Sequence, residues 1–126
     1  MVNKNNLTGN KPPKLVDITA RLTLLKRHTF PGGSMLTARV EYIHRGDFQA
    51  RVFNHPAVDT VPSYDVVNLY FAYALTNVPV SFSLSVTNVF NKDGINNVFT
   101  NPYGLWTTSN EYIPPREIIG SLKYSW

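Results

Sequence analysis

The fold of this chain is decided by residues 80–87, which read VSFSLSVT. Apolar and hydroxyl side chains alternate along this stretch, so an extended backbone carries all the apolar ones on one face. The stretch follows TNVP at residues 76–79, where asparagine and proline mark a turn. The pattern therefore predicts a β-strand that begins directly after a tight turn.

Four other segments show the same alternation, and together they predict an all-β chain. Their apolar faces are formed by Ile18, Ala20, Leu22 and Leu24; Leu36, Ala38, Val40 and Tyr42; Val67, Leu69, Phe71 and Tyr73; and Ile118, Gly120, Leu122, Tyr124 and Trp126. No segment has the i, i+3, i+4, i+7 spacing of an amphipathic helix. We expect five antiparallel strands in up-and-down order, the first at residues 15–25 and the last at residues 117–126.

The composition excludes several classes of function. The net charge is +4, but the basic residues are scattered, with Lys26 and Arg27 the only adjacent pair, so we expect no nucleic-acid partner. The chain has no cysteine, which excludes a disulfide scaffold, a thiolate zinc site and a cysteine nucleophile. It also has no run of about 18 apolar residues and no apolar N-terminal core, so neither a transmembrane helix nor a signal peptide is expected.

Strand length and charge placement favour a sheet that crosses a membrane. Each segment has about eleven residues, against roughly 5–6 in globular proteins and roughly 9–11 for a strand that crosses a bilayer. The charged residues of the strand middles all lie on the polar faces: Asp17, Arg21, Arg39, Glu41, Glu117 and Lys123. A charge that faces lipid costs about 2–4 kcal/mol at the midplane of a barrel, so this separation is expected there.

The connections between the strands alternate in length. Those at residues 26–34 and 75–79 are short, and those at residues 46–63 and 91–115 are long. In an up-and-down sheet, all long loops then emerge at one end, which is typical of outer-membrane barrels. A soluble small-ligand-binding β-barrel or sandwich, with its apolar faces turned inward, remains the alternative.

Several motifs resemble a known family. Residues 88–92, NVFNK, are similar to NLFDK at the end of that family's penultimate strand, and residues 112–116, YIPPR, to the start of its final strand. GNKPP at residues 9–13 and YDVVNL at residues 64–69 are similar to the leads into two earlier strands. On these residues, nearly the whole chain resembles the C-terminal end of a TonB-dependent outer-membrane receptor. Trp126 stands where that family most often has phenylalanine, and Val89 where it has leucine.

The resemblance implies a transmembrane β-barrel of about 22 strands, closed by an N-terminal plug, that imports scarce nutrients such as iron–siderophore complexes. Five strands cannot close such a barrel, so we expect the chain to be the last part of a longer receptor, with Met1 as an internal start. The implied partners are outer-membrane lipid, TonB through the missing plug, a small-molecule ligand, and the barrel-assembly machinery that reads Tyr124 and Trp126.

Aromatic residues of the long loops are the candidates for ligand contact, because exposed loop aromatics are enriched at binding sites. They are Phe48, Phe53, Phe99, Tyr103, Trp106 and Tyr112. The same side chains are also suited to forming small cores inside the loops, and that alternative stays open.

No catalytic group emerges, so we expect no enzyme, no metal site and no cofactor. His28, His44 and His55 lack metal-ligand spacing, and Ser81, Ser83 and Ser85 form a ladder without a neighbouring base. His44 and Asp47 could orient a substrate, but a lone loop histidine is more often only solvated. An outer-membrane barrel enzyme would need an active-site cluster that the sequence does not provide. Four charged residues are expected to pair across the first hairpin or to contact the plug: Asp17, Arg21, Arg39 and Glu41.

Overall fold

A computed structural model describes residues 6–100 and 107–125 of the chain. Within that part the structure is all-β, and it has no helix long and apolar enough to cross a membrane. The strands are β1 (Thr19–Thr29), β2 (Met35–Arg45), β3 (Phe48–Gln49), β4 (Thr60–Val61), β5 (Tyr64–Ala74), β6 (Val80–Thr87), β7 (Ile95–Thr100), β8 (Thr108–Tyr112) and β9 (Glu117–Tyr124).

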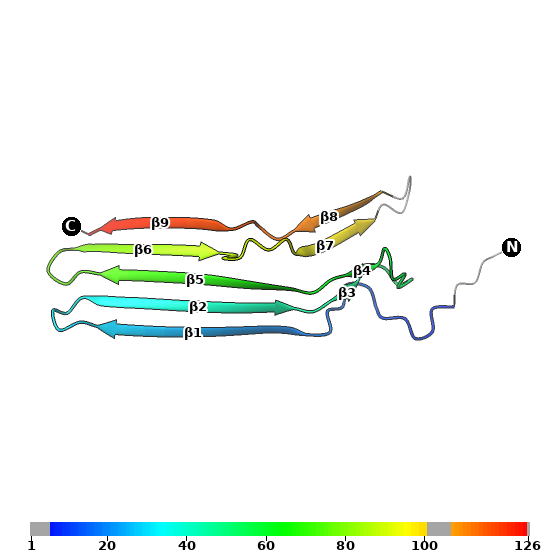
Figure 1. The fold of residues 1–126 in the computed structure, drawn as a ribbon, viewed down its shortest axis with the longest axis horizontal. Coiled ribbons are helices and arrows are strands. Elements are labelled where there is room, and N and C mark those ends of the chain that lie inside the picture. Colours follow the sequence, from blue (N-terminus) through cyan, green and yellow to red (C-terminus); the bar gives the residue numbers. More distant parts are fainter. Residues whose placement is uncertain (1–5, 101–106, 126) are drawn as a thin grey trace. The chain divides into compact units, whose positions relative to one another are not determined.

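The five long strands form one sheet in the order β1-β2-β5-β6-β9, and neighbouring strands run in opposite directions (Figure 1). The up-and-down order predicted from the sequence is therefore confirmed. Two antiparallel hairpins, β3–β4 and β7–β8, lie within the long connections. Among the described residues the five-stranded sheet does not close, so β1 and β9 are edge strands.

The chain divides into two compact units. The sheet unit comprises residues 20–44, 65–93 and 114–125, and holds most of the five long strands. The loop unit comprises the described residues of 6–19, 45–64 and 94–113. Each unit has its own internal hydrogen bonds and is described by itself below.

The register of the sheet places the apolar residues on one face. β5 and β6 pair so that Phe71 lies opposite Leu84, and β6 and β9 pair so that Leu84 lies opposite Gly120. Directly opposed residues of antiparallel strands share a face. The opposite face carries the serine ladder, with Ser83 between Ala72 and Ser121. The two faces predicted by the alternation are therefore confirmed on β5, β6 and β9.

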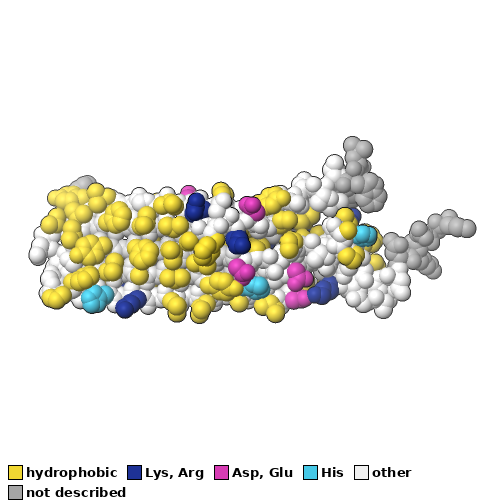
Figure 2. Space-filling model, in the orientation of Figure 1, with side chains coloured by type: hydrophobic (Ala, Val, Ile, Leu, Met, Phe, Trp, Pro, Cys, Tyr) yellow, Lys and Arg dark blue, Asp and Glu magenta, His cyan; other side chains and the backbone are white. Residues whose placement is uncertain are grey.

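The apolar face is not covered by any other described part of the sheet unit. Its side chains are widely exposed: Leu22 58%, Leu24 64%, Phe82 49%, Ile118 63% and Leu122 76%. Figure 2 shows hydrophobic side chains spread widely over one face of the sheet. An apolar surface of this extent on a protein marks contact with a partner or a membrane.

The first strand differs from its predicted position. β1 runs from Thr19 to Thr29, whereas the alternation predicted residues 15–25 with a turn from Lys26 onward. Leu25 and Lys26 break the apolar–polar alternation, but the backbone continues in the ladder up to Phe30, whose amide donates to Ser34 O at 2.8 Å. The end of β1 is therefore set by its backbone pairing with β2 and not by the period of its hydrophobic residues.

Both short turns and the end of β9 lie at the same end of the sheet. Gly33 adopts a φ of +85°, and a side chain at this position would collide with Thr76 of the next short turn. The rings of Phe30 and Tyr73 are 6.1 Å apart, and the Ser125 amide donates to Pro79 O at 2.9 Å. The long connections therefore leave the sheet from its other end.

Asn88 holds together three segments at that other end. It has a φ of +48° and is 4% exposed, and its side-chain amide donates to Lys92 O and to Pro114 O at 3.0 Å each. Its Oδ1 accepts from the Lys92 amide at 2.9 Å, while its own backbone amide donates to Asn68 Oδ1 at 3.0 Å. One side chain thus joins the end of β6 to the segment that leads into β9.

Asn91 repeats this arrangement three residues later. It also has a positive φ, +49°, and its Oδ1 accepts from the Arg116 amide at 2.9 Å. Asparagine tolerates this left-handed conformation better than most residues do. The motifs NVFNK and YIPPR, which are distant in sequence, are therefore hydrogen-bonded to each other.

We expect Asn88→Ala to lower the free energy of unfolding by about 2–3 kcal/mol, because three side-chain hydrogen bonds at a buried position are lost. Glycine adopts a positive φ more readily than asparagine does, but Asn88→Gly loses the same hydrogen bonds, so it should also be destabilising. Urea unfolding in detergent micelles, followed by circular dichroism, measures both variants, with the exposed turn variant Asn77→Ala as the control. An Asn88→Gly variant as stable as the wild-type chain would contradict the role of the side chain.

Candidate functional site

The loop unit has a small hydrophobic core of its own. Phe48, Ala50, Val61 and Val98 are all less than 9% exposed, and Val16 and Ile95 pack against them. The guanidinium of Arg45 lies 5.1 Å from the centre of the Phe48 ring, and its Nη1 donates to Asn96 Oδ1 at 2.5 Å. The long connections are therefore ordered by packing, because segments 45–64 and 94–98 both contribute to this core.

Asp59 is the only fully buried side chain among the described residues. Its Oδ1 accepts from Arg51 Nε at 2.5 Å and its Oδ2 accepts from the His55 amide at 2.8 Å. The backbone of Asp59 also bonds to Ala50 and to His55. Both oxygens of this carboxylate accept a hydrogen bond, and these bonds fix the shape of the loop between β3 and β4.

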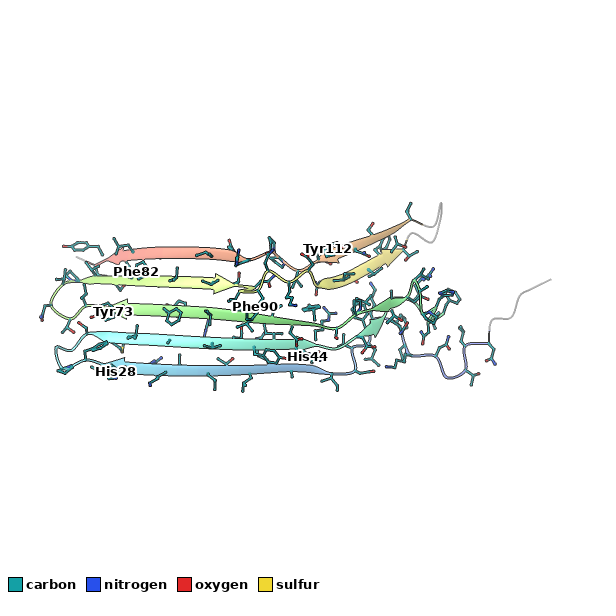
Figure 3. All side chains as sticks on the ribbon, viewed as in Figure 1. His28, His44, Tyr73, Phe82, Phe90 and Tyr112 are labelled. Atoms are coloured by element: carbon teal, nitrogen blue, oxygen red, sulfur yellow. The ribbon has the colours of Figure 1, made fainter. Side chains whose placement is uncertain are left out.

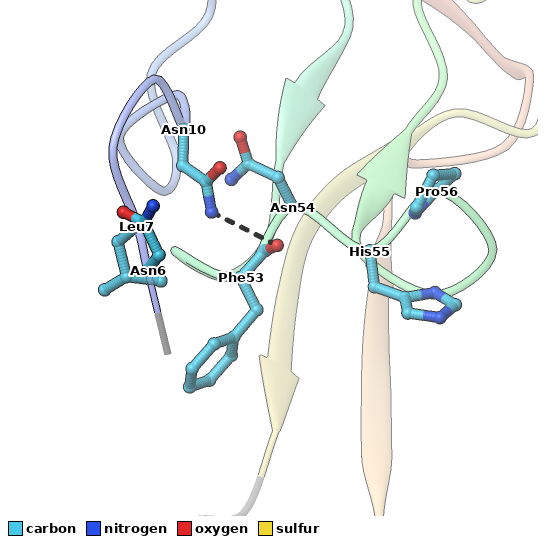
Figure 4. A pocket seen from close by; sticks show the side chains of 7 residues that line it. All are labelled: Asn6, Leu7, Asn10, Phe53, Asn54, His55 and Pro56. Atoms are coloured by element: carbon cyan, nitrogen blue, oxygen red, sulfur yellow. Dashed lines mark hydrogen bonds between the residues drawn. The ribbon is translucent and has the colours of Figure 1, made fainter. Parts of the chain in front are cut away.

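A shallow hollow of about 410 Å³ lies beside this loop (Figure 4). It is lined by Asn6, Leu7, Asn10, Phe53, Asn54, His55 and Pro56. Phe53 is 51% exposed, so its ring is available to a ligand. The volume lies within the range of about 300–1,000 Å³ that is usual for small-molecule sites.

Most of the polar groups around this hollow are already engaged. Asn10 Nδ2 donates to Val52 O at 2.8 Å and to Phe53 O at 3.3 Å, and Asn54 Oδ1 accepts from the Lys11 amide at 2.6 Å. These bonds join the N-terminal segment to the β3–β4 loop. The hollow therefore offers a ligand mainly an apolar and aromatic surface.

Lys11 and Asp17 form an exposed ion pair in the same unit. The hydrogen bond that the Lys11 ammonium donates to Asp17, together with the attraction between their charges, raises the pKa of Lys11 above its ordinary value. Asp17 therefore does not pair across the first hairpin as predicted. Of the expected hairpin pairs, Arg21 and Glu41 form one, at 3.6 Å, whereas the Arg39 guanidinium lies 5.4 Å from the centre of the Tyr70 ring.

The loop aromatics proposed from the sequence have different surroundings. Phe48 is 2% exposed and belongs to the loop core, which is the alternative that the sequence left open. Phe53, Phe99 and Tyr112 are 51%, 61% and 58% exposed and remain available for contact with a ligand. Tyr103 and Trp106 lie outside the described residues.

The aromatics at the turn end of the sheet are neighbours on the apolar face. Figure 3 shows Tyr73 and Phe82 side by side on β5 and β6, in agreement with their register. Phe30 stacks edge-on against His28 at 4.6 Å and lies 6.1 Å from Tyr73. Tyr124, paired with Val80, is 60% exposed, whereas Trp126 lies outside the described residues.

A polar cluster occupies the loop end of the same face. Asp65 Oδ1 accepts from the Tyr42 hydroxyl at 2.6 Å and lies 2.8 Å from His44 Nδ1. His44 is therefore partnered by Asp65 of β5, and not by Asp47 as its spacing in the sequence suggested. In the described ranges no three His, Asp or Glu side chains are placed to hold a metal ion.

Neither the hollow nor the burial of the acid can be predicted from the sequence, and the physical reason is the same for both. Lys11 and Asn54 are far apart in the chain, and only the folded loops bring them together. Asp59 could have been suspected from the nearby arginine and histidine, but nothing in the sequence indicates its burial. No known protein family, curated protein or solved structure matches this chain.

We expect Asp59→Ala to loosen the β3–β4 loop, because the Arg51 guanidinium and the His55 amide both lose their acceptor. Hydrogen exchange at the Ala50 amide, which donates to Asp59 O at 2.6 Å, should accelerate about tenfold or more. The exposed variant Asp47→Ala is the matched control and should leave this rate unchanged. Equal rates in the two variants would contradict the structural role of the buried carboxylate.

Proposed function

We propose that this chain is the C-terminal barrel segment of a TonB-dependent outer-membrane receptor, which takes up a scarce nutrient such as an iron–siderophore complex. The observation that carries the proposal is the apolar face of the five-stranded sheet, which is exposed along every strand. Strands buried in a soluble protein pack such a face against a second layer. Lipid is the covering that this surface fits best.

The outline of the apolar band supports a membrane in particular. On β9 the band extends to the turn end at Tyr124 and stops before Arg116. On β1, Lys26 and His28 interrupt the same face between Leu24 and Phe30. The band therefore has a limited height along the strands, as the lipid-facing band of a transmembrane barrel does.

Aromatic rings at the turn end of the sheet support the same placement. Phe30, Tyr73, Phe82 and Tyr124 lie there, between 36% and 60% exposed. Rings of this kind favour the boundary between hydrocarbon and headgroups, where they form the girdles of outer-membrane barrels. The turn end would then face the periplasm, and the long connections would face the cell exterior.

Among outer-membrane barrels, the two hydrogen-bonded motifs NVFNK and YIPPR support the family of TonB-dependent receptors. NVFNK and YIPPR are the stretches that resemble the last two strands of TonB-dependent receptors. The Asn88 side chain donates to Pro114 O and the Asn91 side chain accepts from the Arg116 amide, so the two stretches are hydrogen-bonded to each other. A sheet edge cannot remain unpaired in hydrocarbon. The edges β1 and β9 would pair with further strands of the full barrel, or with other copies when the chain is reconstituted alone.

The remaining roles follow from this placement. Phe53, Phe99 and Tyr112 would meet the imported ligand on the outer side, and Tyr124 with Trp126 would be read by the barrel-assembly machinery. The serine-rich face would line the lumen and contact the plug, through which TonB supplies energy. The chain would then form part of the barrel wall of a transporter and carry no catalytic group.

We expect the isolated 126-residue chain to sediment from detergent-free buffer and to be recovered as a β-rich species only in detergent micelles. Centrifugation, followed by circular dichroism of the detergent fraction, measures this. A soluble monomer that melts cooperatively without detergent would contradict the membrane placement and favour a soluble β-barrel or sandwich.

A further inference from the structure

Two basic side chains interrupt the apolar face near its turn end. Lys26 and His28 occupy on β1 the positions that continue Leu22 and Leu24, so they share the face of these leucines. Arg27, between them, belongs to the opposite face. A basic side chain and a histidine are visible together at this end of the apolar surface in Figure 2.

A hollow of about 250 Å³ opens beside these two residues. It is lined by Lys26 and His28 of β1 and by Leu36 and Ala38 of β2. The short side chain of Ala38 leaves the space that a larger residue would fill. The hollow is smaller than most small-molecule sites, which begin at about 300 Å³, and suits a compact charged group with an apolar chain beside it.

The Lys26 ammonium takes part in none of the ion pairs formed by the described residues. An ammonium on a lipid-facing surface is unfavourable in the hydrocarbon, but it becomes favourable at headgroup depth, where lipid phosphates supply the opposite charge. Lys26 lies on the apolar face directly beyond Leu24, near the turn end of β1 at Thr29. Both the position of Lys26 and its positive charge therefore favour a lipid phosphate as its partner.

We propose that this hollow binds the headgroup phosphate of an anionic phospholipid. Lys26 contacts the phosphate as a cation and His28 donates a hydrogen bond to it, while Leu36 and Ala38 contact the start of an acyl chain. The inference rests on the proposed membrane placement and adds to it a lipid class and the residues that select it.

Lipid-selective quenching tests the site in the full chain, which has no native cysteine. A bimane label on Val40→Cys, on the apolar face of β2, reports the nearby lipid in vesicles of phosphatidylcholine and phosphatidylglycerol. One vesicle set carries bromine on the phosphatidylglycerol, and the other carries it on an equal amount of the phosphatidylcholine. The ratio of the two quenching strengths gives the lipid preference at this place.

We expect brominated phosphatidylglycerol to quench more strongly, and Lys26→Gln to reduce this preference about fivefold. Lys26→Arg should keep the preference. Arg27→Gln is the matched control, since it removes the same charge from the next residue on the opposite face, and it should change nothing. Inorganic phosphate, added at constant ionic strength, should not reduce the preference.

Four outcomes would overturn the site. They are an unchanged preference in Lys26→Gln, an equal loss in Arg27→Gln, displacement by inorganic phosphate, and equal quenching by the two brominated lipids. Each of these leaves the face in lipid, so the proposed function stands without the headgroup site. If neither lipid quenches the label, the face is not in the membrane, and both the site and the proposed function fail.

Discussion

The apolar face of the five-stranded sheet is the constraint on which the rest of the structure depends. Because the side-chain period of a strand is two, the register that pairs Phe71 with Leu84 and Leu84 with Gly120 places most apolar residues of these strands on the same side, with Tyr70 and Ile119 on the other. A shift by one residue would put the serine ladder and Lys123 on that side instead. Water does not stabilise so large an apolar surface, so this face of the sheet needs a covering.

Asn88 and Asn91 connect two motifs that are distant in the sequence. Asn88 and Asn91 adopt positive φ angles that end β6, and their side chains bond to the segment that leads into β9. Without these bonds the last strand would depend only on its pairing with β6, along one edge of the sheet. The junction therefore orders the segment after a long connection, while the loop unit is ordered separately by Phe48, Val61 and the buried Asp59.

Local periodicity was sufficient to predict the sheet but not the loops. The boundaries of β6 and the two faces of the sheet follow from alternation alone, because each residue's side is set by its immediate neighbours. The end of β1 was mispredicted because pairing with β2 continues where alternation stops at Lys26. The hairpins β3–β4 and β7–β8, the burial of Phe48 and the partner of His44 all depend on contacts between distant segments, which no local pattern encodes.

The central claim is that lipid covers one face of the sheet and not the other. Ser83 and Leu84 are adjacent on the central part of β6 and belong to opposite faces, so they form a matched pair of labelling sites in a chain without native cysteine. The most direct measurement is the quenching of a bimane label on Ser83→Cys and on Leu84→Cys by lipids brominated at the middle of their acyl chains. Strong quenching at position 84 and weak quenching at position 83 is the expected result, whereas equal quenching, or stronger quenching at position 83, would contradict it.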